Sequence, residues 1–155
     1  PRAALQLKGV RATLPNVRFV FLVRNPYDVI RSYLEMNDNE APVAEIATRW
    51  RKANLNILKM TRRAPKRCLI VKYEQLVADE SGTIGEIMEH IRAEPGGDAA
   101  NLRCLSDVPS VPHFQNVTKP VFTSSVGRGI QKLSKEELDV INPIIEDVRT
   151  ALGYE

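Results

Sequence analysis

The stretch RFVFLVRNPYDVIRS, residues 18–32, decides the fold that this sequence predicts. The apolar run over residues 17–23 is short and rich in Val and Phe, which is typical of a buried parallel strand. The run stops at Arg24-Asn25-Pro26, and this corner suits the start of a helix, because Asn is a good N-cap and Pro fits the first turn. The sequence therefore predicts a strand, a tight corner and a helix, with Arg24 at the carboxyl end of the strand, where open α/β sheets bind ligands.

Arg24 and Ser32 together indicate a phosphate site on this rim. Ser32 lies seven residues after Asn25, about two helical turns, and so faces the same side as the corner. A guanidinium group binds phosphate through a bidentate fork, and a hydroxyl adds a further hydrogen bond. Other interpretations stay open: Arg24 ends in solvent or pairs with Asp28, and Ser32 bonds back to a carbonyl of its own helix.

The rest of the chain predicts a partial α/β domain. Apolar periodicity and capping signals predict helices over 2–13, 26–36, 43–62, 81–92 and 134–152, and a second strand over 67–72. Residues 93–133 are predicted to form an irregular loop or lid, and 134–152 a closing helix. Two buried parallel strands need further neighbours, so we expect one domain over 1–155 whose amino-terminal part precedes Pro1.

Composition narrows the function classes. Fifteen Lys and Arg stand against five Asp and Glu in residues 1–72, a local excess of positive charge. Aromatic residues make up only 6% of the chain, which offers no base-stacking platform, so an anionic nucleotide is favoured over nucleic acid. These residues contain no apolar run of membrane-spanning length, and no signal peptide is visible among them. The two cysteines, Cys68 and Cys104, have no metal-ligand spacing, and a reducing cytoplasm is the expected compartment.

A second candidate anion site lies near the carboxyl terminus. Residues 108–132 contain no acidic side chain, and within them SSVGRG, residues 124–129, offers hydroxyls, backbone amides and Arg128. The glycines on either side of this arginine permit the backbone geometry of an anion nest. The alternative is an ordinary surface loop.

These segments resemble a known family. The pattern strand-R-[DN]-P-x-D-x-x-x-S is similar to the 3′-phosphate-binding segment of sulfotransferases that use 3′-phosphoadenosine 5′-phosphosulfate (PAPS). Three further segments resemble the same family in the expected order: residues 1–26, residues 67–91 with Y-E-Q-L-V, and residues 119–154 with S-S-V-G-R and a final Leu-Gly-Tyr. The resemblance covers nearly the whole chain.

The resemblance implies a P-loop-NTPase-like sulfotransferase fold with a parallel sheet flanked by helices. It also implies transfer of a sulfuryl group from PAPS to a hydroxyl or amine acceptor, with adenosine 3′,5′-bisphosphate released and no metal required. In the family pattern Arg24, Ser32 and Arg128 hold the 3′-phosphate and Tyr73 lies near the adenine. Donor-binding residues are thus expected at Arg24, Ser32, Tyr73, Ser124, Ser125, Gly127 and Arg128.

Several departures leave alternatives open. The family's glycine-, serine- and threonine-rich loop for the 5′-phosphosulfate is absent, and Gly129 stands where relatives often carry an aromatic residue. The general base is unknown, since His90 and His113 suit structural roles and Glu74 suits a helix start. A non-catalytic interaction module and a P-loop kinase are the rival interpretations. Expected partners are the acceptor and either the missing amino-terminal portion or a second copy, with no nucleic acid or membrane.

Overall fold

The computed structural model describes residues 17–36, 41–92 and 126–154. Two short strands, β1 (Phe19–Val23) and β2 (Cys68–Lys72), form a parallel pair in which Phe19 lies opposite Cys68 and Val23 opposite Lys72. The helical elements are α3 (Pro26–Met36), α4 (Val43–Arg63), the 3₁₀ helix η1 (Pro65–Arg67), α5 (Tyr73–Ala78), α6 (Glu80–Ile91), α7 (Arg128–Lys132) and α8 (Lys135–Ala151). The described residues therefore have a mixed α/β architecture.

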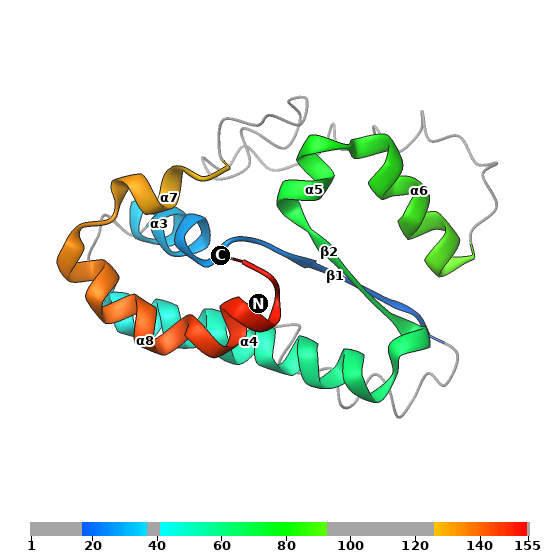
Figure 1. Ribbon diagram of the computed structural model, residues 1–155, viewed down its shortest axis with the longest axis horizontal. Helices are drawn as coiled ribbons and strands as arrows, with labels where there is room; N and C mark the ends of the chain where they lie inside the picture. Colours follow the sequence, from blue (N-terminus) through cyan, green and yellow to red (C-terminus); the bar gives the residue numbers. More distant parts are fainter. Residues whose placement is uncertain (1–16, 37–40, 93–125, 155) are drawn as a thin grey trace.

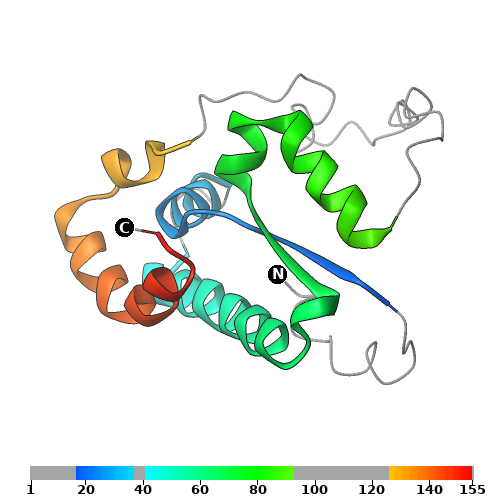
Figure 2. The same ribbon diagram turned by 45° about the vertical axis from the view of Figure 1, so that its right-hand side comes forward.

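Helices lie on both sides of the two strands (Figure 1). The long helices α4 and α8 run along one side, and α5 and α6 lie on the other, as a turned view also shows (Figure 2). Both strands run in the same direction, so the segments that follow them leave from one edge. Arg24, after β1, and Tyr73, after β2, are therefore neighbours at the carboxyl edge of the sheet.

The core lies between the strands, α3, α4 and α8. Ile30, Ile141 and Ile145 are completely buried, and Trp50, predicted to be a core residue, is 5% exposed. Arg51 of α4 contacts the Asp147 carboxylate of α8 through both of its oxygens, and this guanidinium keeps the pKa of Asp147 below its usual value. The closing helix therefore docks on α4 through an apolar stripe with an ion pair at its rim.

The predicted elements in the described ranges are confirmed to within one or two residues at most ends. The capping box of α8 is also confirmed, with Ser134 and Glu137 each accepting a hydrogen bond from the other's backbone N–H. The predicted helix over 2–13 lies outside the described residues. None of the helices in the described part of the chain combines the length and apolar character needed to cross a membrane.

Two predictions need correction. The sequence predicts a first strand buried on both faces, but Val20 is 36% and Leu22 56% exposed, because alternate residues point to opposite faces and only one face of β1 is covered within the described ranges. The sequence also predicts an irregular segment over 93–133, but residues 128–132 form α7, which packs on α3. The rest of that segment, residues 93–125, lies outside the described residues.

Truncation of Ile145 tests the docking of α8. The Ile145→Ala variant should lower the free energy of unfolding by about 2–5 kcal/mol, because it leaves a cavity at a completely buried site. The matched control is Val140→Ala on the same helix, where the side chain is 44% exposed and the change should stay within about 0.5 kcal/mol. Urea denaturation measures both, and equal effects would contradict the packing described here.

Candidate functional site

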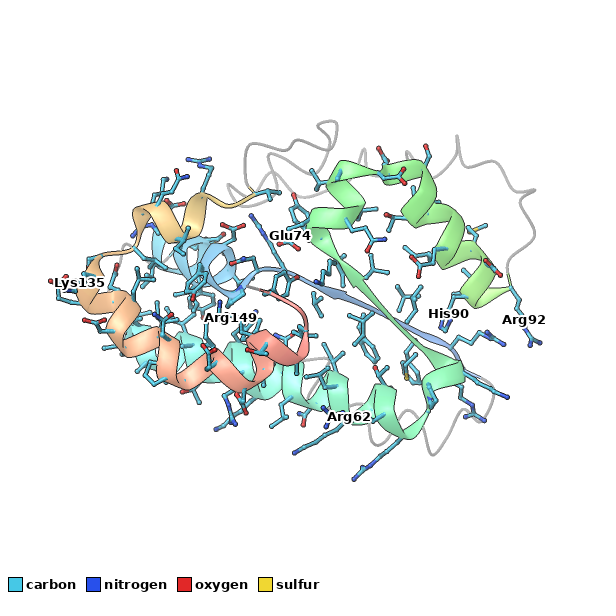
Figure 3. The ribbon with its side chains drawn as sticks, viewed as in Figure 1. Arg62, Glu74, His90, Arg92, Lys135 and Arg149 are labelled. Atoms are coloured by element: carbon cyan, nitrogen blue, oxygen red, sulfur yellow. The ribbon has the colours of Figure 1, made fainter. Side chains whose placement is uncertain are left out.

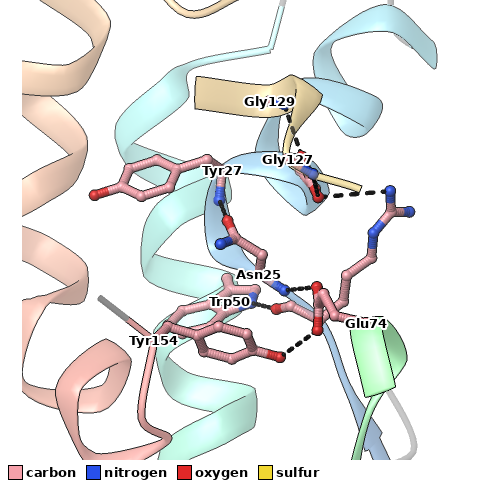
Figure 4. Close-up of polar contacts among 9 residues, drawn as sticks. Asn25, Tyr27, Trp50, Glu74, Gly127, Gly129 and Tyr154 are labelled. Atoms are coloured by element: carbon pink, nitrogen blue, oxygen red, sulfur yellow. Dashed lines mark hydrogen bonds and ion pairs between the residues drawn. The ribbon is translucent and has the colours of Figure 1, made fainter. Parts of the chain in front are cut away.

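The corner after β1 is fixed by hydrogen bonds to two other parts of the fold and by one hydrogen bond of its own (Figure 4). The carbonyl oxygen of Arg24 accepts a hydrogen bond from the Trp50 indole N–H of α4 at 3.2 Å. The backbone N–H of Asn25 donates to Glu74 Oε1 of α5 at 2.8 Å, and Asn25 Oδ1 accepts from the Tyr27 N–H at 3.0 Å, as an N-cap does. The backbone that carries Arg24 is thus held in one position.

The Arg24 side chain lies between an aromatic ring and a carboxylate. Its guanidinium carbon is 4.6 Å from the centroid of the Tyr73 ring, a cation–π contact, and its Nη2 is 3.9 Å from Asp28 Oδ2. The second distance is an ion pair and too long for a hydrogen bond. Because the side chain is 26% exposed, the guanidinium reaches the surface at the carboxyl edge of the sheet. The alternative interpretation of Arg24, pairing with Asp28, is therefore present in the structure.

Asp28 also binds the backbone of a distant segment. Its carboxylate is buried, and its Oδ2 accepts from the Gly127 N–H at 2.9 Å while its Oδ1 accepts from the Gly129 N–H at 2.7 Å. A buried charge requires such compensation. The sequence predicts an anion nest at this segment, and in the structure the anion that these two amides hold is the Asp28 carboxylate. Arg24 and the start of α7 consequently meet at one oxygen atom, Asp28 Oδ2.

Glycine is required on both sides of Arg128. Gly127 has a φ of +74°, in the left-handed region where other residues are strained. A Cβ atom on Gly129 would lie 2.2 Å from the Tyr27 carbonyl carbon and 2.4 Å from the Asp28 nitrogen, so no side chain fits between α7 and α3. Only glycine at position 129 therefore allows this close approach of α7 to α3. At the other end of α7, Lys132 bonds Glu35 at 2.8 Å and keeps the pKa of Glu35 below its usual value.

The structure brings together part of the predicted donor-binding set. Arg24, Tyr73, Gly127 and the backbone of Arg128 lie around Asp28, and the Arg128 side chain is exposed. Ser32 is exposed on α3, one turn beyond Asp28 on the same face of the helix. Ser124, Ser125 and His113 lie outside the described residues.

The remaining candidate residues have structural contacts. The carbonyl oxygen of His90 accepts from the Arg18 guanidinium, which precedes β1, so His90 lies at the other end of the sheet from Arg24. Glu74 lies in the first turn of α5, as predicted, and Tyr73 is the first residue of that helix. Cys68 is buried in β2. Within the described ranges, no group of three or more His, Cys, Asp and Glu side chains is placed to hold a metal ion.

Sequence reasoning missed a clamp that joins the carboxyl terminus to this corner. Tyr154 is buried, and its hydroxyl donates to Glu74 Oε2 at 3.0 Å, while Glu74 Oε1 accepts from Asn25. Burial and the adjacent Glu74 carboxylate raise the pKa of Tyr154 well above its usual value, so the phenol remains a donor. Lys72 bonds the Gly153 carbonyl at 2.8 Å and lies 4.7 Å from the Tyr154 ring centroid. The only signal in the sequence is the final Leu-Gly-Tyr.

Substitution of Gly129 tests the close approach of α7 to α3. The Gly129→Ala variant should lose about 1–3 kcal/mol of stability, because the new methyl group overlaps the backbone of Tyr27 and Asp28. The control is Gly85→Ala in α6, where an added Cβ meets nothing within 4 Å and helix propensity favours Ala by up to about 1 kcal/mol. Thermal unfolding of the two variants should therefore shift in opposite directions, and a harmless Gly129→Ala would show that the helices are not in contact.

Removal of one hydroxyl tests the carboxyl-terminal clamp. Tyr154→Phe should destabilise the protein by about 1.5–3 kcal/mol at pH 7, since it removes a hydrogen bond to the Glu74 carboxylate. Tyr33→Phe is the control, because the Tyr33 hydroxyl accepts an exposed hydrogen bond from Arg49 and should contribute less to stability. The pKa of Tyr154 is higher in the native state than in the unfolded chain, where it is about 10. The stabilisation that results is complete below a pH of about 10 and is lost as the pH rises further. The difference between wild type and Tyr154→Phe should therefore shrink above pH of about 10, and a constant difference would contradict this assignment.

Comparison with known proteins agrees with this geometry. A model of the "Sulfotransferase family" matches residues 1–94, a range that includes β1, the Arg24 corner, β2 and the Tyr73–Glu74 pair. No curated protein matches the chain. The matched range covers most of the residues, and it holds the two strands whose carboxyl ends carry the candidate site. The chain belongs to the sulfotransferase family.

Proposed function

We propose that this chain supplies the 3′-phosphate and adenosine side of a PAPS site in a sulfotransferase with a P-loop-NTPase-like fold. The reaction moves a sulfuryl group from PAPS to a hydroxyl or amine acceptor and releases adenosine 3′,5′-bisphosphate. One observation supports this proposal above the others: a partly exposed arginine, an aromatic ring and the first turn of α7 meet at the carboxyl edge of two parallel strands. That edge is where open α/β sheets bind nucleotides.

The charges around Asp28 favour binding of a phosphate. Two guanidinium groups, those of Arg24 and Arg128, belong to this rim. The carboxylates of Asp28 and Glu74 in the same corner are each held by hydrogen bonds inside the protein. The Asp28 oxygens accept two amide hydrogen bonds, and Arg24 Nη2 lies 3.9 Å from Oδ2, beyond hydrogen-bond distance. The planar fork of the Arg24 guanidinium matches the oxygens of a 3′-phosphate, with Arg128 and the Ser32 hydroxyl as further ligands.

Other residues of the proposed site orient the donor. The Tyr73 ring stacks on the Arg24 guanidinium and lies next to the adenine, while Ser124, Ser125 and Gly127 lie near the nucleotide. These residues bind and position the donor. The charge that develops on the sulfuryl group is neutralised by other groups, which bind the 5′-phosphosulfate. The general base that accepts the proton of the acceptor stays unassigned.

Binding of two nucleotides tests the proposal. Adenosine 3′,5′-bisphosphate should bind at least about tenfold more tightly than adenosine 5′-monophosphate, because only the former carries the phosphate that Arg24 recognises. Arg24→Ala should lower the affinity for the bisphosphate by about tenfold or more and leave the affinity for the monophosphate nearly unchanged. Isothermal titration calorimetry on the full chain measures both affinities, and a melting curve shows that the variant is folded.

The matched control is Arg49→Ala on α4, an exposed arginine that pairs with Glu45 and lies outside the site. This variant should bind both nucleotides as the wild type does. Equal affinity of wild type and Arg24→Ala for the bisphosphate would contradict the role of Arg24. Binding of ATP as tight as that of the bisphosphate would instead favour a kinase-like nucleotide site.

A further inference from the structure

Three arginines line a pocket at the end of the strands opposite Arg24. Arg18 precedes β1, Arg67 ends η1 just before β2, and Arg92 follows α6; together with Ile91 they surround a cavity of about 500 Å³. Arg92 lies at the end of α6 away from Glu74 (Figure 3). Because Arg18 and Arg24 stand at the two ends of β1, the pocket is roughly 20 Å from the proposed donor site.

The three arginines of this pocket have no acidic partner among the described residues. Arg18, Arg67 and Arg92 form no ion pair there, and the Arg18 guanidinium donates to the backbone carbonyl of His90. Three like charges around one cavity repel one another, so this arrangement does not serve stability. A doubly charged anion in the cavity would relieve the repulsion, and guanidinium forks match the oxygens of sulfate and phosphate.

The backbone of Arg92 supports a role outside folding. Arg92 has a φ of 56° and a ψ of 40°, the left-handed conformation at the end of α6, and within the described ranges it is the one residue other than glycine with a positive φ. Glycine usually occupies this position, because other residues are strained there. A strained residue whose side chain lines a charged pocket is typical of a functional site.

We propose that this pocket binds an organic sulfate or phosphate ester. The oxyanion lies among the Arg18, Arg67 and Arg92 guanidinium groups, and the organic part contacts Ile91, an apolar side chain that is 41% exposed. The cavity is larger than a bare ion needs and is in the size range of sites for small organic ligands. This proposal rests on residues outside the proposed donor site and does not depend on it.

Calorimetric titration with 4-nitrophenyl phosphate and with inorganic phosphate, at a mildly alkaline pH where both are mostly dianions, tests this assignment on the full chain. The ester should bind more tightly than the bare ion of equal charge, because only the ester contacts Ile91. Arg67→Gln and Arg92→Gly should each lower the affinity for the ester by about tenfold or more. Arg92→Gly should also keep or raise the melting temperature, since glycine removes the backbone strain. Arg63→Gln is the matched control: this exposed arginine ends α4, does not line the pocket, and should change the affinity less than about threefold.

Three results would overturn the assignment. Equal weakening by Arg63→Gln and Arg67→Gln would show attraction to a diffuse basic surface. Ester binding no tighter than that of inorganic phosphate would show an adventitious ion only. Displacement of the ester by adenosine 3′,5′-bisphosphate, or loss of ester binding in Arg24→Ala, would place the ester in the donor site. Because ester binding is measured without the nucleotide, failure here leaves the donor-site proposal untouched, and failure of that proposal leaves this one untouched.

Discussion

The buried carboxylate of Asp28 is the constraint on which the candidate site depends. It accepts hydrogen bonds from the Gly127 and Gly129 amides and lies 3.9 Å from Arg24, so it joins the corner after β1 to a segment about a hundred residues later in the chain. A carboxylate removed from water has to be compensated in this way. Because the compensation comes from two amides and a guanidinium group, satisfying Asp28 brings Arg24 and the start of α7 together in the candidate site.

The parallel arrangement of β1 and β2 explains why charged residues gather at both ends of the sheet. Residues that follow the strands, Arg24 and Tyr73, meet at the carboxyl edge, and residues that precede them, Arg18 and Arg67, meet at the amino edge. Helices fix both groups: α5 and α8 hold the carboxyl edge through Glu74 and Tyr154, and α6 ends beside the amino edge. One topological unit therefore carries two separate clusters of arginine.

Local sequence signals predicted most of the fold and only part of the site. The strand and corner around Arg24, the amphipathic α4 and the capped α8 follow from periodicity and end signals within each segment. The link from Asp28 to Gly127 and Gly129 does not, because it is a tertiary contact and an acidic residue in a first turn already has a helix-dipole explanation. The same holds for Glu74, which bridges Asn25 and Tyr154. Exposure of Leu22 differs from the prediction because an apolar run does not reveal which neighbours cover each face.

Amide hydrogen exchange at Gly127 and Gly129 measures the Asp28 bridge directly. In a ¹⁵N-labelled sample of the full chain, both amides should be protected, and Asp28→Ala should remove that protection while the Gly85 amide in α6 stays protected. Addition of adenosine 3′,5′-bisphosphate should slow exchange at the two glycines further in the wild type only. Exchange of Gly127 and Gly129 at the rate of an unfolded chain in the wild type, or equal protection in Asp28→Ala, would contradict the assembly of the site around this carboxylate.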